Sequence, residues 1–134
     1  MTEVSNAGWK IGEIPAITDY GRIPIAGWVH GFFGLDFRVW SSETDEEFQK
    51  GWCLTHLPTG RIAMGIFTPL DRAQELADEL SSLGDWSFSE GEDSRSLAAI
   101  ARSFRDKHRH VVSFRSAHYS PLWAVETQPA GDPA

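Results

Sequence analysis

Apolar and polar residues alternate through the middle of the chain in a pattern that predicts a β-hairpin over about residues 51–67. The turn is predicted at residues 57–60, where Pro58 suits the second position of a type I turn and Gly60 supplies the left-handed residue that closes a three-residue loop. If Leu57 pairs with Arg61, three opposed pairs follow: His56 with Ile62, Leu54 with Met64, and Trp52 with Ile66. Most of these side chains are large and apolar, so we expect their face to be buried. The other face should have thin cover or face solvent; it holds Cys53, Thr55, Arg61, Ala63 and Gly65.

Apolar residues at helical spacing then predict an amphipathic helix over about residues 69–83. Thr68 is the expected N-cap, and Asp71 three residues later completes a capping box in which Asp replaces Glu. Pro69 takes the first helical position, and Gly84 is expected to end the helix. The expected buried stripe is Leu70, Ala73, Leu76, Ala77, Leu80 and Leu83.

The flanking segments predict further strands and a second helix. Strands are expected at residues 9–14 (ended by Pro15), 23–29, 35–40, 111–117 and 122–126. Ser94 is expected to cap a helix that ends near Lys107 and buries Leu97, Ile100, Ala101 and Phe104. We therefore predict an α+β fold: a curved antiparallel sheet of four to six strands with two helices packed on one face. Residues 1–127 would form a single domain, and residues 128–134 a disordered tail.

Charge is distributed unevenly along the 134 residues. The net charge is −7, with 16 acidic and 6 basic residues in residues 1–94 but 3 acidic and 6 basic residues in residues 95–134. The single cysteine excludes an internal disulfide and a cysteine-cluster metal site. The N-terminus lacks the pattern of a signal peptide, and the longest apolar run is too short to span a bilayer. These features predict a cytoplasmic protein without a membrane partner.

The acidic residues allow two interpretations. They are either solvated surface charges or a surface that binds a basic protein partner. In the second case the predicted partner-binding residues are Asp71, Glu75, Asp78, Glu79, Glu90, Glu92 and Asp93. Direct binding of nucleic acid by this acidic part would be repulsive.

The end of the second helix is basic, and it offers a candidate phosphate or nucleic-acid contact at Arg102, Arg105, Lys107 and Arg109. Two structural explanations compete with that hypothesis. The cations would stabilise the negative end of the helix dipole, or they would pair with the acidic first helix if the two helices are antiparallel.

Candidate catalytic residues are few. His56 lies beside the predicted turn, where we expect it to bridge core and turn through a bond to a backbone group. Cys53 should point to the opposite face, which argues against a nucleophile pair. The cations around His108 and His110, with His118 beyond, disfavour a metal ion. No nucleotide-binding or hydrolase motif occurs. We therefore predict no catalytic residue, no metal and no cofactor.

The hairpin residues Leu54-Thr55-His56-Leu57-Pro58-Thr59-Gly60, after a tryptophan and before a helix, resemble a pattern found in small phage and plasmid proteins. The resemblance covers about 30 of the 134 residues and implies a protein of a mobile element. Such small acidic proteins are often inhibitors of host systems, including anti-restriction and anti-CRISPR proteins.

Taken together, these features predict a small acidic, non-enzymatic binding protein that inhibits a nucleic-acid-handling machine of the host by occupying a basic protein surface. Two alternatives stay open at this point. One is an immunity protein that neutralises a basic toxin. The other is a small enzyme that uses His56 or His118 as acid or base.

Overall fold

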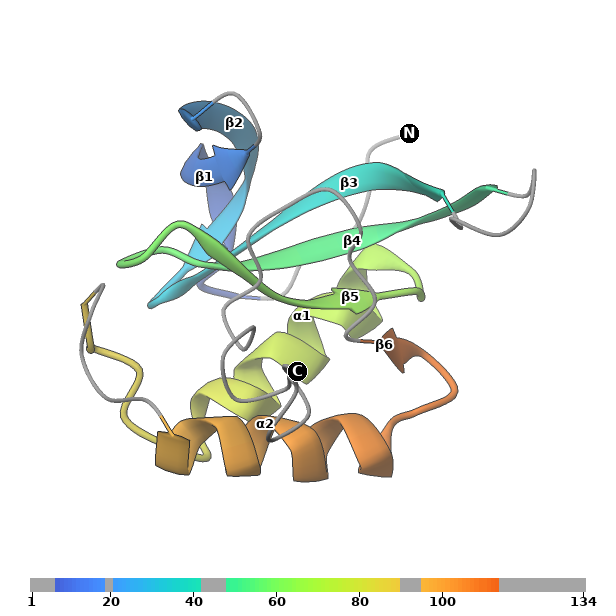
Figure 1. The fold of residues 1–134 in the computed structure, drawn as a ribbon. Coiled ribbons are helices and arrows are strands. Elements are labelled where there is room, and N and C mark those ends of the chain that lie inside the picture. The colour runs from blue at the N-terminus through green and yellow to red at the C-terminus, as the bar shows by residue number, and fades with distance from the viewer. Residues whose placement is uncertain (1–6, 19–20, 42–47, 90–94, 114–134) are drawn as a thin grey trace, which may run out of the picture.

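The described part of the molecule is an open antiparallel sheet with two helices on one side (Figure 1). The computed structural model describes residues 7–18, 21–41, 48–89 and 95–113. The six strands follow the chain order: β1 (Lys10–Thr18), β2 (Gly21–His30), β3 (Phe33–Ser41), β4 (Phe48–His56), β5 (Arg61–Ile66) and β6 (Val112–Ser113). The helices are α1 (Leu70–Ser81) and α2 (Arg95–Lys107). The predicted fold class is confirmed. Neither described helix is long and apolar enough to span a membrane.

The main core lies between the sheet and the two helices. Leu54 from β4 and Leu76 from α1 are both completely buried there, as the strand alternation and the helical spacing of apolar residues predict. α1 buries its expected stripe except Leu83, which is 46% exposed because the helix ends at Ser81 and not at Gly84. α2 has the expected bounds and buries Leu97, Ala101 and Phe104 as predicted, but Ile100 is only partly buried and Ala98 is buried in addition.

The hairpin between β4 and β5 has the predicted register only in its outer half. Trp52 opposes Ile66 and Leu54 opposes Met64, as expected. A bulge after Leu54 then shifts the register, so that His56 opposes Arg61 and the loop has four residues, with Gly60 in the expected left-handed conformation (φ +76°). The predicted pairing of His56 with Ile62 is therefore wrong. Ala63 joins the main core, and Ile62 lies on the other face beside Cys53.

That other face is buried, contrary to the prediction of thin cover. Cys53 and Thr55 are completely buried because β1 and β2 form a long ribbon that bends away from the helices and over this face (Figure 1). The side chain of Ile14 in this ribbon approaches the backbone of β2 and β3 so closely that glycine is required there. A Cβ atom at Gly27 or Gly34 would lie only 2.7 Å from it. The ribbon reaches the far end of the sheet, where the Ile17 N–H donates to the Gly60 carbonyl (2.9 Å).

Two local predictions fail at prolines and caps. β1 continues through Pro15 because it is an edge strand, where proline is tolerated. The N-cap of α1 is Pro69, without a side-chain capping bond, and not Thr68. Asp71 instead accepts the N–H of Arg72 (2.8 Å). Ser94 and the parts of the predicted C-terminal strands and tail beyond residue 113 lie outside the described residues.

Candidate binding surfaces

His56 is a structural residue at the centre of three elements. Its Nε2–H donates to the Trp86 carbonyl (2.7 Å), which leaves Nδ1 to accept the Thr59 hydroxyl (2.9 Å). The ring also stacks on Phe88, with centroids 4.3 Å apart. Because His56 is completely buried and both nitrogens are bonded, it joins the hairpin turn to the segment after α1. The predicted bond to a backbone group is confirmed.

Burial of His56 predicts a loss of stability in mild acid. Burial lowers the pKa of His56, although the bond to the Trp86 carbonyl opposes that effect. As the pH falls below about 6.5, the unfolded chain therefore binds a proton that the folded chain does not bind, and unfolding is favoured. Urea unfolding between about pH 8 and 5.5 should show a steeper loss for the wild type than for His56→Gln. Parallel pH dependences would contradict this role.

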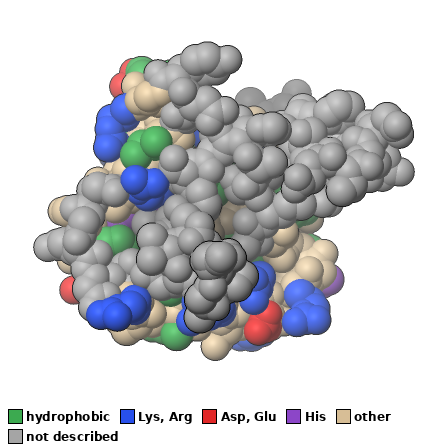
Figure 2. All heavy atoms as spheres, viewed as in Figure 1, with side chains coloured by type: hydrophobic (Ala, Val, Ile, Leu, Met, Phe, Trp, Pro, Cys, Tyr) green, Lys and Arg blue, Asp and Glu red, His purple; other side chains and the backbone are tan. Residues whose placement is uncertain are grey.

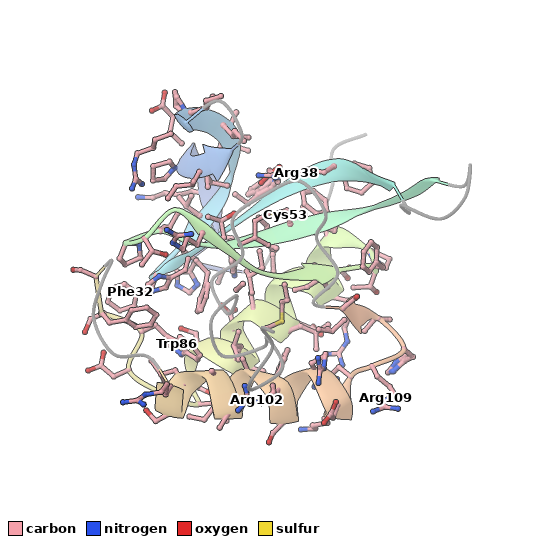
Figure 3. The ribbon with its side chains drawn as sticks, in the orientation of Figure 1. Phe32, Arg38, Cys53, Trp86, Arg102 and Arg109 are labelled. Carbon is pink, nitrogen blue, oxygen red and sulfur yellow. The ribbon has the colours of Figure 1, made fainter. Side chains whose placement is uncertain are left out.

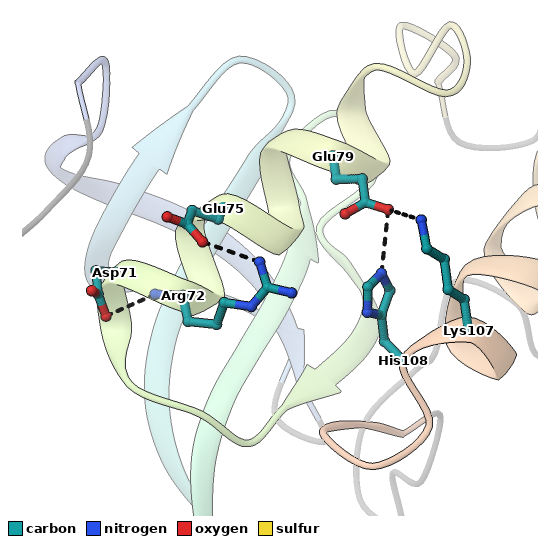
Figure 4. Close-up of polar contacts among 6 residues, drawn as sticks. All are labelled: Asp71, Arg72, Glu75, Glu79, Lys107 and His108. Atoms are coloured by element: carbon teal, nitrogen blue, oxygen red, sulfur yellow. Dashed lines mark hydrogen bonds and ion pairs between the residues drawn. The ribbon is translucent and has the colours of Figure 1, made fainter.

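The acidic face predicted for α1 is divided by internal contacts. Asp71 and Glu75 are exposed, and Glu75 pairs with Arg72 (Figure 4). Asp78 accepts the Trp9 indole N–H (3.1 and 3.2 Å) and contacts His30 (3.1 Å), so it fastens the start of the described chain to α1. The other three predicted residues, Glu90, Glu92 and Asp93, lie outside the described residues.

Glu79 joins the two helices and is not available as a simple surface charge. Its carboxylate accepts Lys107 (3.0 Å) and contacts His108 (3.2 Å) (Figure 4). The hydrogen bond from Lys107 is the main cause that lowers the pKa of Glu79. The alternative of internal pairing between the helices is thus confirmed for Lys107. This contact removes Glu79 from the continuous acidic surface that the sequence suggested.

The basic residues at the end of α2 separate onto two flanks. Lys107 faces α1, whereas Arg105 and Arg109 share the carboxylate of Asp106 at the surface (3.3 and 3.5 Å). By helical spacing, Arg95 and Arg102 lie on one flank of α2, whereas Arg109 follows the end of the helix at Lys107.

Several of the chain's basic side chains lie on or directly after α2. Figure 2 shows basic side chains spaced along the edge of the molecule formed by α2.

The face away from the helices contains a buried thiol and a buried ion pair (Figure 3). Burial raises the pKa of the Cys53 thiol to about 12, so the reactive thiolate is strongly disfavoured. Asp36, directly opposite Cys53, pairs with Arg38 through two bonds of 2.6 and 3.2 Å. Among the described residues, no three His, Cys, Asp or Glu side chains are grouped to hold a metal ion.

A hollow opens where β2 and β3 diverge, and we call it the fork hollow. The two strands pair over only three residues each, ending at Trp28 and Leu35, although β2 extends back to Gly21 and β3 forward to Ser41. The hollow measures about 350 Å³ and is lined mainly by Ile11, Ile25, Trp28, Asp36, Phe37 and Trp52.

Two apolar side chains at the fork hollow are exposed. Ile11 is 65% exposed and Phe37 is 54% exposed, with the Phe37 ring in edge contact with Trp52 (centroids 5.0 Å apart). Isolated apolar residues on a surface are ordinary, but an apolar hollow with exposed aromatic walls is typical of an interaction site. No predicted site residue lies in it.

Comparison with family models, with curated proteins and with solved structures gives no match.

Proposed function

We propose that this protein is a non-catalytic binding protein that captures an extended segment of a protein partner in the fork hollow. The exposure of Phe37 and Ile11 beside diverging strands carries the proposal. Two further observations support binding over catalysis by the candidate residues of the hairpin. Both ring nitrogens of His56 form hydrogen bonds within the fold, and the Cys53 thiol is completely buried.

The backbone at the fork favours an extended partner. A two-residue loop joins β2 and β3, so His30 and Phe33 form a hydrogen-bonded pair. Every second residue of a strand directs its backbone N–H and C=O groups to the same side, so those of Leu35 and Phe37 also point to the β2 side. β2 no longer pairs with β3 beyond Leu35. Among the described residues, Phe37 therefore pairs with a neighbouring strand only on the β4 side. An added strand would bond to this edge and place alternate side chains in the hollow.

The partner that we propose is a nucleic-acid-handling protein with a basic surface. The net charge of −7 supports this choice, because opposite charges accelerate association. By occupying such a protein, the chain would act as an inhibitor, for example of a host defence machine. The divided acidic face of α1 gives only Asp71 and Glu75 as exposed contacts, so we assign the main contact to the fork hollow.

A short peptide of alternating valine and lysine tests this proposal. We expect it to shift the backbone amide NMR signals of residues 26–28 and 36–38, because a paired strand changes their hydrogen bonding. Phe37→Ser should weaken binding at least about fivefold, since the apolar contact is lost. Leu83→Ser, which removes a similarly exposed apolar side chain on the helical side, should have no effect.

The same peptide with proline at alternate positions is the second control. Proline has no N–H and cannot extend a strand ladder, so this peptide should not bind. Binding of both peptides alike, or signal changes away from the fork, would exclude strand addition at this site.

A further inference from the structure

The walls of the fork hollow are two pairs of residues that oppose each other on neighbouring strands. Ile11 of β1 lies opposite Trp28 of β2, and Phe37 of β3 lies opposite Trp52 of β4. Trp28 also lies opposite Leu35, two residues before Phe37. Opposed residues share a face of a sheet, and so does every second residue of a strand. All these side chains therefore lie on one face, where three aromatic rings bound the hollow.

Two of these rings form a corner. The ring planes of Phe37 and Trp52 are 64° apart, and their centroids are separated by 5.0 Å. Trp52 is only 6% exposed, so its ring is a fixed wall, whereas the exposed ring of Phe37 forms the rim. The π face of an aromatic ring is negative and attracts cations, most strongly in tryptophan. Several rings around one hollow are typical of sites that hold a quaternary ammonium group.

Asp36 is the one ionisable side chain among the described residues that line the hollow. It follows Leu35 and precedes Phe37, so its carboxylate lies on the other face, behind the rings. Both of its oxygens accept hydrogen bonds from Arg38, at 2.6 and 3.2 Å. The described part of the hollow therefore offers a cation the faces of rings and not a free carboxylate.

This combination favours a quaternary ammonium group over a primary one. A primary ammonium group has three N–H donors, which need acceptors once the group leaves water. A trimethylammonium group has no donor, so a wall of rings and aliphatic side chains leaves none of its atoms unsatisfied. The hollow, at about 350 Å³, has room for such a group.

We infer that the fork hollow binds a quaternary ammonium group, carried as a trimethylated lysine by the extended segment of the partner. The inference rests on the proposed function, because the added strand would bring the lysine to the hollow. A strand beside Phe37 directs every second side chain to the face that carries the rings. The net charge of −7 also favours a cationic segment.

Three forms of the valine–lysine peptide test the inference by calorimetric titration of the full chain. The central residue is lysine, trimethyl-lysine or an analogue with a neutral tert-butyl group in place of the trimethylammonium group. The trimethylated peptide should bind at least about fivefold more tightly than the lysine peptide. It should exceed the tert-butyl peptide by a similar factor, because that peptide keeps the shape and lacks only the charge.

A matched pair of variants locates the effect. Phe37→Leu keeps an apolar side chain but removes the ring, so the ratio of the affinities for the trimethylated and lysine peptides should fall below about two. The control Phe32→Leu removes a 39% exposed ring in the turn between β2 and β3, outside the hollow, and should leave the ratio unchanged. Amide NMR spectra verify that both variants fold. The comparison of peptides on the wild type needs no variant.

The outcomes separate this inference from the proposed function. Equal binding of the lysine and trimethyl-lysine peptides, with signal changes at the fork, would overturn the inference and leave strand addition standing. Equal binding of the trimethyl-lysine and tert-butyl peptides would have the same meaning, since shape and not charge would then be recognised. If no peptide binds, both proposals fail. Displacement of the peptide by an equal concentration of free choline would identify a small ligand or a lipid headgroup and exclude the strand-borne lysine.

Discussion

Replacing Trp86 by alanine should lower the free energy of unfolding by about 3–5 kcal/mol. Trp86 is only 1% exposed, and its indole N–H donates to the Leu80 carbonyl (3.1 Å) at the end of α1. Its ring meets the edge of Phe33 (centroids 5.4 Å apart), and its own carbonyl accepts from His56. The substitution would therefore empty part of the core and release the segment after α1. Urea unfolding measures the change.

The variant Trp86→Phe separates packing from hydrogen bonding. It keeps an aromatic ring against Phe33 but removes the indole donor, so its loss should lie between those of the wild type and the alanine variant. A loss below about 1 kcal/mol for Trp86→Ala would mean that the segment around Trp86 does not belong to the cooperative core.

The second large effect concerns the buried ion pair on the other face. Asp36→Ala should cost about 3–5 kcal/mol, because it leaves the Arg38 guanidinium buried without its carboxylate. The two side chains are only 6% and 10% exposed, so water cannot replace the lost partner. Thermal and urea unfolding should show the loss at neutral pH.

Removing both charges should be far less harmful. Burial raises the pKa of Asp36, against the opposing effects of its hydrogen bond and charge interaction with Arg38, so desolvation outweighs the attraction. Asp36→Leu/Arg38→Met should consequently be close to the wild type in stability, within about 1–2 kcal/mol. If the double variant is as unstable as Asp36→Ala, the loss comes from packing and not from breaking the ion pair.

The spacing of apolar residues predicts the elements of this fold wherever burial of one face decides the structure. The apolar stripe of α2 and the outer pairs of the hairpin, at Trp52 and Leu54, follow from periodicity alone. The bulge beside Ala63 does not, because an inserted residue changes the register without changing the apolar pattern. Pro15 predicts the end of the first strand, but β1 continues through it because β1 is an edge strand, and that position depends on the order of the whole sheet.

The candidate sites were harder to predict than the fold. The structural role of His56 followed from its place beside a turn. The internal contacts of Asp78 and Glu79 could not be predicted from the sequence of α1, because their partners Trp9 and Lys107 lie far away in the chain. The fork hollow exists because β2 and β3 separate beyond Trp28 and Leu35. The residue pattern within either strand does not predict the position at which they separate.

The order of the sheet also has a consequence for how the chain folds. From β1 to β5, each strand pairs with the strand before it, so these pairings need only short loops to close. β6 is different: it reaches β5 only after both helices have intervened in the chain. Five strands can therefore assemble while synthesis is still under way, whereas the last pairing among the described strands must wait until α1 and α2 have left the ribosome.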